Sequence, residues 1–283
     1  MDVLRGTVLR CVDPHVGHSP RPYSRIPAPG ILRRDVGLAF GSFLASQCLV
    51  DIPAQASEPV RSQTFLSGQQ ADLIFPPEFQ GTWNVTSVLQ KVDLPFGESQ
   101  VPDISQVRRA QMDDLDKPKE YQVRFVTLDN GWTIMDRKFN TASLLQTYMG
   151  MDIAEASRRI QWDPLKPDHM SVSLPRGLRI TSDINQRSQS LKSDDLLETS
   201  EFYQQFIDDS QKVKLKASTA FTKWRWRSPP ESSSSRSSDD VAIVATQTIA
   251  DFVDPNDRRV SLQSLGRPIV LYTYRLSFKR SIV

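Results

Sequence analysis

Paired carboxylates are the first residues in this chain that could do chemistry. Two neighbouring acids whose pKa values differ can serve as a general acid and a general base. Adjacent acids in polar stretches are usually solvated surface groups, however, and all the pairs in this chain lie in such stretches. The pairs are Asp113-Asp114, Asp194-Asp195, Asp208-Asp209 and Asp239-Asp240. We therefore assign no catalytic residue among them.

The segment 251–257 resembles a calcium-binding loop only loosely. It reads Asp-Phe-Val-Asp-Pro-Asn-Asp. An EF-hand loop needs a central glycine and a distal glutamate, and this segment has neither. A turn is the simpler interpretation, because Asp, Asn and Pro all favour turns.

Histidine and cysteine chemistry is limited by where these residues lie. Cys11, Cys48, His15 and His18 all fall within the first 56 residues, which leaves His169 as the one histidine of the remainder. A metal site or a Ser-His-Asp relay would need partners that the remainder lacks. No glycine-rich phosphate loop is present either. We predict no metal and no cofactor, and we interpret His169 as an exposed loop residue in preference to a pH switch.

The sequence Trp224-Arg225-Trp226-Arg227 alternates aromatic rings with cations. Such a mixture could bind nucleic acid or anionic lipid, but a half-buried strand end gives the same alternation, and we favour the strand. Six of the 35 basic and four of the 33 acidic residues precede position 57, so 57–283 is neutral. A neutral body predicts no nucleic-acid partner, whereas a peripheral membrane contact stays open.

The first 56 residues have the composition of a targeting address. Residues 1–32 are rich in arginine and proline, as organelle transit peptides are rich in basic residues. Arg33-Arg34, a short apolar run over 36–46 and the small residues Ala54 and Ala56 then form a twin-arginine signal in 33–56. The two-part address predicts a chloroplast protein of the thylakoid lumen that is cleaved after Ala56. A twin-arginine signal alone would instead indicate a bacterial periplasm.

Beyond a flexible leader over 57–70, the pattern predicts a single β domain over 71–283. Residues 82–89, 120–128 and 268–279 alternate apolar and polar side chains, as half-buried strands do. Asn130-Gly131 predicts a type I′ hairpin turn. Because the first and last strands are both strongly amphipathic, we expect them to pair. The fold class is mainly β, an antiparallel barrel or a strongly curled sheet with a few short helices.

Several further elements are predicted with less regular patterns. Short helices are expected over 141–149, from Asp152 to Arg159, and over 194–208. Residues 212–227 form a strand in which the apolar phase flips, which predicts a bulge near Thr222. The long polar connection 93–117 is interpreted as a lid, a partner loop or disorder, and the Pro/Ser-rich 228–240 as a disordered loop.

Four stretches together resemble a plant and cyanobacterial family known as domain of unknown function 6816. They are 76–87, 136–140, 199–206 and 268–276. The resemblance implies a plastid location and supplies no activity and no site residues. A second similarity is to lipocalin-like barrels, in which a G-x-W motif such as Gly81-Thr82-Trp83 opens the first strand and a late arginine stacks on the tryptophan. Arg275 is our first candidate for that arginine and Arg280 the second.

Two functions remain open. The first is a soluble, non-catalytic lumenal protein that assists or assembles photosynthetic membrane complexes. The alternative is a lipocalin-like carrier of a small apolar ligand such as a pigment, lipid or quinone. A hollow interior would favour the carrier and a filled one the partner protein. The candidate ligand-binding residues are Trp83, Tyr121, Phe125, Tyr272, Tyr274 and Arg275.

Overall fold

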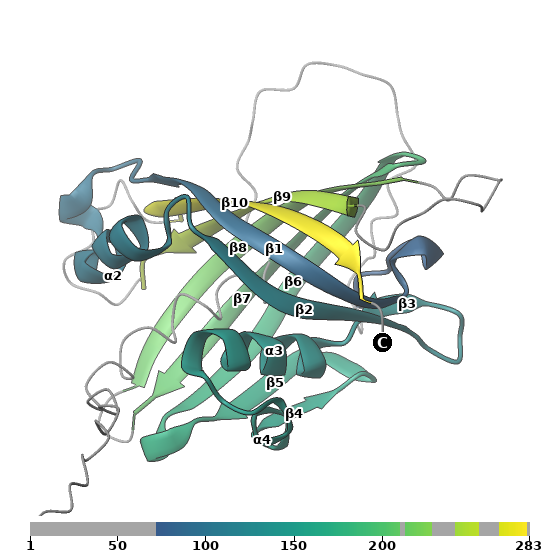
Figure 1. Ribbon diagram of the computed structural model, residues 1–283. Coiled ribbons are helices and arrows are strands. Elements are labelled where there is room, and N and C mark those ends of the chain that lie inside the picture. Colours follow the sequence, from purple (N-terminus) through teal and green to yellow (C-terminus); the bar gives the residue numbers. More distant parts are fainter. Residues whose placement is uncertain (1–71, 210–212, 228–240, 255–265, 282–283) are drawn as a thin grey trace, which may run out of the picture. The chain divides into compact units, whose positions relative to one another are not determined.

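Ten antiparallel strands form one strongly curled sheet in the computed structural model of the protein (Figure 1). The structure describes residues 72–209, 213–227, 241–254 and 266–281. The strands are β1 (Gly81–Asp93), β2 (Pro118–Thr127), β3 (Thr133–Met135), β4 (Ile160–Asp163), β5 (Lys166–Ser173), β6 (Arg179–Ser193), β7 (Leu196–Asp208), β8 (Val213–Trp226), β9 (Val241–Phe252) and β10 (Val270–Arg280). The predicted fold class is confirmed. The targeting residues Arg33, Arg34, Ala54 and Ala56, the leader 57–70 and the loop 228–240 lie outside the described residues.

The strand order joins the two ends of the domain but leaves the sheet open. Neighbouring strands run β3-β2-β1-β10-β9-β8-β7-β6-β5-β4. β1 pairs with β10 from Trp83 opposite Arg280 to Asp93 opposite Leu271, as predicted for the first and last strands. β3 and β4 are the free edges, so the sheet curls strongly without hydrogen-bonding into a closed barrel.

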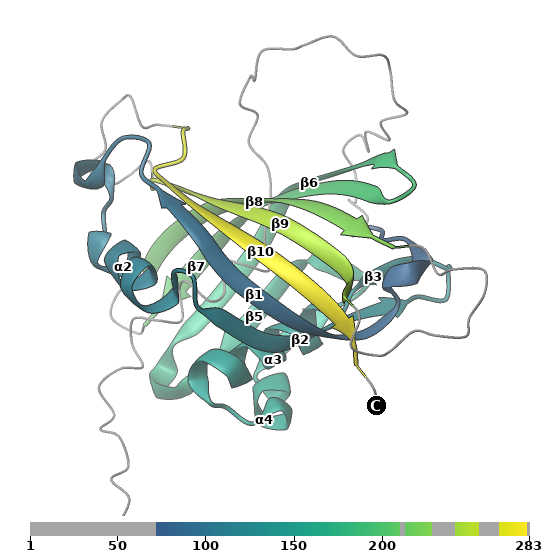
Figure 2. The ribbon, with the colours of Figure 1, turned by 45° about the horizontal axis from the view of Figure 1, so that its top comes forward.

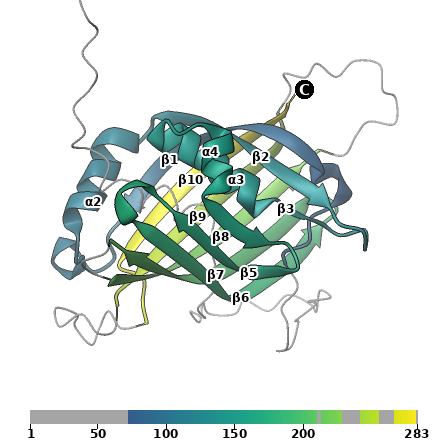
Figure 3. The same ribbon diagram turned by 90° about the horizontal axis from the view of Figure 1, so that it is seen from below.

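Helix α3 (Arg137–Met149) lies beside the gap between these edges (Figure 3). β3 is short: it pairs with the last residues of β2 and, on its other side, forms a single bridge from Thr133 to Phe75. The N–H groups of Gln122 and Arg124 on the uncovered edge of β2 donate to Ser143 Oγ at 2.8 Å and Asn140 Oδ1 at 2.7 Å. Side chains of α3 therefore satisfy backbone groups that a further strand would otherwise pair, which also protects the edge.

The predicted hairpin and two of the predicted helices are present. β2 and β3 are joined through Asp129-Asn130-Gly131, but only Gly131 has a positive φ, so the turn is not type I′. Asp136 caps α3 by accepting from the N–H of Phe139 at 2.9 Å. Asp152 caps α4 (Ile153–Arg158) by accepting from two N–H groups, each at 3.0 Å.

Three sequence-based expectations differ from the structure. Residues 194–208 form a hairpin turn and β7, not a helix. β8 pairs with β7 and β9 without a register shift, so there is no bulge near Thr222. Residues 93–117 are not a structureless connection: they contain α2 (Ile104–Arg109) and a π-helical turn (Ala110–Asp114), which bury Val107 and Ala110 against the core.

Candidate functional site

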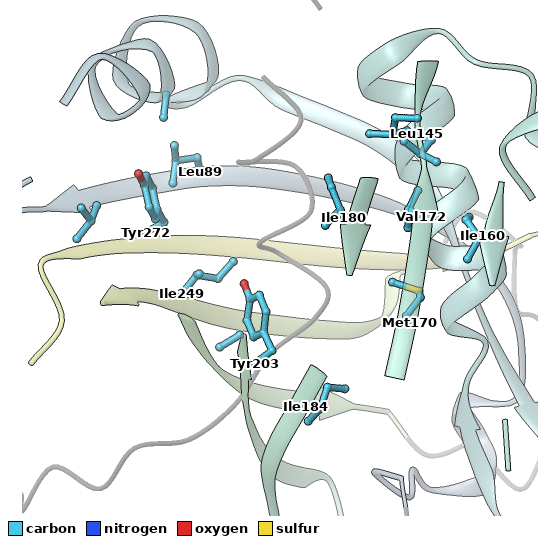
Figure 4. Packing of buried hydrophobic residues seen from close by; sticks show 14 of the residues in the cluster. Leu89, Leu145, Ile160, Met170, Val172, Ile180, Ile184, Tyr203, Ile249 and Tyr272 are labelled. Atoms are coloured by element: carbon cyan, nitrogen blue, oxygen red, sulfur yellow. The ribbon is translucent and has the colours of Figure 1, made fainter. Parts of the chain in front are cut away.

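The interior changes in character along the strands, and strand register shows how. Inward side chains of β7, β8, β9 and β10 form successive rows across the sheet. The first row is Leu197, Trp224, Ala245 and Leu276. The next two rows are Thr199, Thr222, Gln247 and Tyr274, and then Glu201, Ala220, Ile249 and Tyr272. Figure 4 shows Ile249, Tyr203 and Tyr272 gathered on the inner face, from three strands. The last complete row is Tyr203, Ser218, Asp251 and Val270. The interior therefore runs from aromatic to polar.

Aromatic side chains fill the interior at one end of the sheet, which we call the plugged end. Phe79 is fully buried, and its ring contacts Phe75, Phe125 and Trp226 at centroid distances of 5.4, 5.3 and 5.4 Å. These rings are tilted or edge-to-face, the arrangements that add attraction to simple burial. The chain before β1 supplies Phe75 and Phe79, so residues 73–79 close this end like a plug. Figure 2 shows the short turn at Pro77–Phe79 beside β3, at the end of the sheet away from α2.

Arg280 joins the last strand to this plug. Its guanidinium lies 4.4 Å from the Trp83 ring centroid and donates to the carbonyl oxygens of Gln80 at 2.7 Å and Glu78 at 3.1 Å. Gly81 has a φ of +114°, and a Cβ there would lie 2.8 Å from Arg280 Nη1, so glycine is required. Arg275, our first candidate for this contact, is exposed on the outer face. The second candidate makes it.

A buried cluster of four charges anchors the start of the plug. Arg137 of α3 donates to Glu201 of β7 at 2.6 Å and to both oxygens of Asp72, and Arg187 of β6 donates to Glu201 at 2.9 Å. The four side chains are at most 6% exposed. Burial lowers the pKa of Arg137, but the charges of Asp72 and Glu201 outweigh it and raise the pKa overall. The cluster is electrically balanced, as buried charges must be.

The opposite end contains a cavity of about 370 Å³. β8 extends past the end of β9, since their last pair is Ala217 with Phe252. The cavity lies between this extension, the end of β9, the start of β10 and the α2 segment. Its lining residues are Val101, Pro102, Asp103, Gln106, Val107, Ile207, Val213, Lys214, Leu215, Lys216, Asp251, Phe252, Asp254, Ile269, Val270 and Tyr272. Its volume is at the lower end of the range of small-molecule sites, roughly 300–1,000 Å³.

A polar chain runs from the core to the cavity wall. Ser218 Oγ donates to one oxygen of Asp251 at 2.6 Å, and Lys216 Nζ lies 3.0 Å from the other. Tyr203 is hydrogen-bonded to Ser218. Burial and the nearby charge of Asp251 raise the pKa of Tyr203, and the same two causes, in the same order, raise that of Tyr272. Both phenols are therefore neutral at ordinary pH and can donate a hydrogen bond. This wall can orient one polar group of a ligand.

The candidate ligand-binding residues do not form one site. Trp83, Tyr121 and Phe125 belong to the filled end. Tyr272 lines the cavity, and Tyr274 lies one row away. Arg275 faces outward. Sequence reasoning missed the cavity residues Lys214, Lys216 and Asp251, and Ser218, which donates to Asp251 behind the cavity wall. A signal for Lys216 and Ser218 alone was present, because an unbroken even phase of Lys216, Ser218, Ala220, Thr222, Trp224 and Trp226 describes one inward face.

The other sequence candidates are surface or packing features. His169 lies in β5, and its Nδ1 is 2.6 Å from Asp183 Oδ1 in an exposed pair. Asp114 pairs with Lys119 at 3.1 Å. Trp224 and Trp226 are buried and Arg225 is exposed, as expected of a half-buried strand. Within the described ranges, no group of three or more His, Cys, Asp or Glu side chains could hold a metal ion. None of the described helices has the length and apolar character needed to cross a membrane.

Fold and site define an antiparallel, strongly curled β-sheet protein with one filled end and one hollow end. The chain belongs to the family described as domain of unknown function DUF6816, whose model matches residues 67–282. No curated protein and no solved structure matches the chain. The expected similarity to lipocalin-like barrels therefore stays a prediction.

Proposed function

We propose that this protein binds a small amphipathic molecule in the cavity between α2 and the ends of β8, β9 and β10. The observation that carries the proposal is the cavity itself, about 370 Å³ in a domain whose other end is packed with aromatic rings. Its walls combine apolar side chains such as Val270 and Ile269 with a few polar groups. This is the usual make-up of a ligand site, in which apolar walls give affinity and polar groups give orientation.

The polar wall defines the class of ligand. Asp251 and Lys216 are 13% and 19% exposed, so both charges lie near the cavity but are not freely hydrated. A ligand with one hydrogen-bonding head group, such as a hydroxyl, carbonyl or carboxylate, would meet Lys216 and Tyr272. Its apolar body would lie along Val107 and Ile269. A fully apolar molecule would leave this wall without its water and without a replacement, at a cost of about 1–3 kcal/mol per group.

The test is fluorescence titration with 8-anilinonaphthalene-1-sulfonate, which has an apolar body and one anionic group. Gln106 lines the cavity from α2 and is only half-buried, so Gln106→Trp would fill the cavity without displacing core side chains. Gln106→Ala is the matched control, since it removes the same side chain and leaves the cavity open. We expect saturable binding to the wild type and to Gln106→Ala, and at least tenfold weaker binding to Gln106→Trp.

Unchanged binding in Gln106→Trp would show that the dye binds elsewhere, and the proposal would fail. If binding is lost in Gln106→Trp as expected, native mass spectrometry of protein purified from its source would identify the natural ligand. A retained mass of a few hundred daltons is expected for a cavity at the lower end of the small-molecule range.

We propose the thylakoid lumen as the compartment, on the strength of the two-part address in residues 1–56. N-terminal sequencing of the mature protein tests this, and an N-terminus far from Ser57 would contradict it. The role as an assembly partner of photosynthetic complexes is the second candidate from the sequence. Affinity purification from thylakoids would support it by returning a stable complex, whose absence would leave the ligand-binding role.

A further inference from the structure

The outer face of the sheet carries a basic surface that the proposed function does not use. We define it by Lys223 and Arg225 on β8, Arg227 directly after β8, and Arg275 and Lys279 on β10. All five are exposed and point away from the interior. Strand register places Lys223 and Arg275 in one row on either side of Thr246, and Arg225 in the next row beside Val244. The cations thus form two columns about 10 Å apart, with β9 between them.

The positive charge of this basic surface is only partly balanced by acidic side chains beside it. Glu198 of β7 lies at its border, where it pairs with Lys223 at 3.2 Å. Arg225, Arg227 and Arg275 form no ion pair with any residue in the described ranges. The outward positions of β8, β9 and β10 around them, 221–227, 242–248 and 273–279, include no acidic residue. Such a concentration of one sign on an otherwise neutral body attracts an anionic partner.

Exposed apolar side chains continue the same outer face toward the hollow end. Phe221 of β8 precedes Lys223 by two residues, and Phe206 of β7 lies opposite Leu215. Phe206 and Phe221 are each 41% exposed. Phe202 and Phe252 lie between these two residues and contact each other edge-to-face, with ring centroids 6.2 Å apart. Exposed aromatic residues next to a basic area are what a protein surface needs to insert into the interface of an anionic membrane.

From these two observations we infer that the outer face of β7–β10 binds an anionic lipid bilayer surface. The cations of the basic surface would contact headgroup phosphates, and Phe206 and Phe221 would enter the interface beside them. A bilayer offers both kinds of contact on one surface, because its anionic headgroups lie directly above an apolar layer. The inference does not depend on the cavity, which opens between α2 and the strand ends.

The experiment is co-sedimentation of the full chain with vesicles of phosphatidylcholine alone or with about one third phosphatidylglycerol. Arg225→Gln/Arg275→Gln removes two cations of the basic surface. Arg158→Gln/Arg179→Gln, on α4 and β6, is the matched control that removes two exposed cations elsewhere. Because every variant keeps residues 1–71, the contribution of that segment cancels in the comparison. Each surface cation contributes about fivefold, so the first variant should bind about thirtyfold less and the control should be unchanged.

A second variant tests whether the exposed phenylalanines enter the membrane interface. Phe206→Gln/Phe221→Gln keeps every charge, and its side chains are exposed, so the fold should be retained. We expect its binding to phosphatidylglycerol vesicles to fall at least tenfold. Equal binding of the wild type and Arg225→Gln/Arg275→Gln would overturn the inference. Loss with the arginine variant but none with the phenylalanine variant would overturn the insertion of Phe206 and Phe221, because binding would then depend on headgroup charge alone. Gln106→Trp should bind vesicles like the wild type, whichever way the cavity test comes out.

Discussion

The two ends of this curled sheet solve the problem of filling a β interior in opposite ways. At the plugged end, Phe75, Phe79, Phe125 and Trp224 pack ring against ring, and residues 73–79 close the opening. At the cavity end, β9 stops short of β8 and the space beyond is lined rather than filled. The same strands pass through both ends, so the difference lies in side chains and in strand length.

The two ends contribute differently to the stability of the fold. A packed aromatic interior contributes most to stability, because each ring buries a large apolar area and interiors are close-packed. A lined cavity forfeits part of that packing, since its lining side chains lack partner atoms on one side. A domain can lose packing at one end only if other contacts hold the fold, and here the buried charge cluster and Arg280 hold the two ends of the plug segment, at Asp72 and at Glu78 and Gln80.

Breaking the buried charge cluster should have the largest effect. Glu201→Gln would leave Arg137 and Arg187 with Asp72 as their one carboxylate partner, and we expect a loss of about 3–5 kcal/mol in the free energy of unfolding. Asp251→Asn, at the cavity, should cost about 1 kcal/mol, because Lys216 can turn toward water. Urea unfolding of both variants measures the difference. Equal losses would mean that the two ends do not differ in how tightly they enclose charge.

Two isoleucines, one at each end, allow the contribution of packing to the free energy of unfolding to be compared. Ile243 is 1% exposed in the aromatic cluster, and Ile269 is 4% exposed on the cavity wall. Ile243→Ala should cost about 4 kcal/mol, and Ile269→Ala about 2 kcal/mol, because the cavity wall has fewer contacts to lose. The measurement is again the free energy of unfolding in urea. A larger loss for Ile269→Ala would indicate that the cavity is filled.

The same contrast explains which elements the sequence could predict. In β1, β2 and β10 the inward side chains are apolar, including Val85, Val123 and Phe278, so alternation gave both the strand and its inner face. In β7 the inward residues include Thr199, Glu201 and Gln205, while Phe202 and Phe206 point outward. The usual rule places apolar side chains inside, and β7 breaks that rule. Its apolar residues therefore did not alternate as a strand's should, and the sequence predicted a helix there.

β8 shows the same failure at the cavity. Its odd-numbered residues Val213, Leu215 and Phe221 are apolar, whereas the polar Lys216 and Ser218 share the even phase of the buried residues Ala220 and Trp224. The rule therefore predicted a phase flip that the structure does not contain. The cavity residues could not be found from composition either, because the partners of Lys216 and Ser218 come from β9, and only the register brings Asp251 beside them.

Alkaline unfolding tests whether water in the cavity reaches Tyr272. Burial raises the pKa of both Tyr272, at the cavity, and Tyr121, at the plugged end. Above about pH 10 the unfolded chain loses these phenolic protons and the folded chain keeps them, so stability falls as pH rises. Tyr272→Phe and Tyr121→Phe should each reduce that fall by about 1.4 kcal/mol per pH unit. The fall should be absent below pH 9.

Urea unfolding at pH 8, 10 and 11 measures these slopes. If Tyr272→Phe leaves the slope of the wild type unchanged while Tyr121→Phe reduces it, water reaches Tyr272 and stabilises its phenolate. The contrast between the ends would then be one of hydration as well as packing.

Arg280→Lys should have the smallest effect, about 1 kcal/mol in the free energy of unfolding. Lysine keeps the charge but loses the planar guanidinium, which stacks on Trp83 and donates to two carbonyl oxygens at once. Arg275→Lys is the control, because Arg275 is an exposed arginine of the same strand and should tolerate the change. If the two substitutions cost the same, the contact of Arg280 with the plug adds nothing beyond charge. The closure of the plugged end would then depend on the aromatic rings and the buried charge cluster alone.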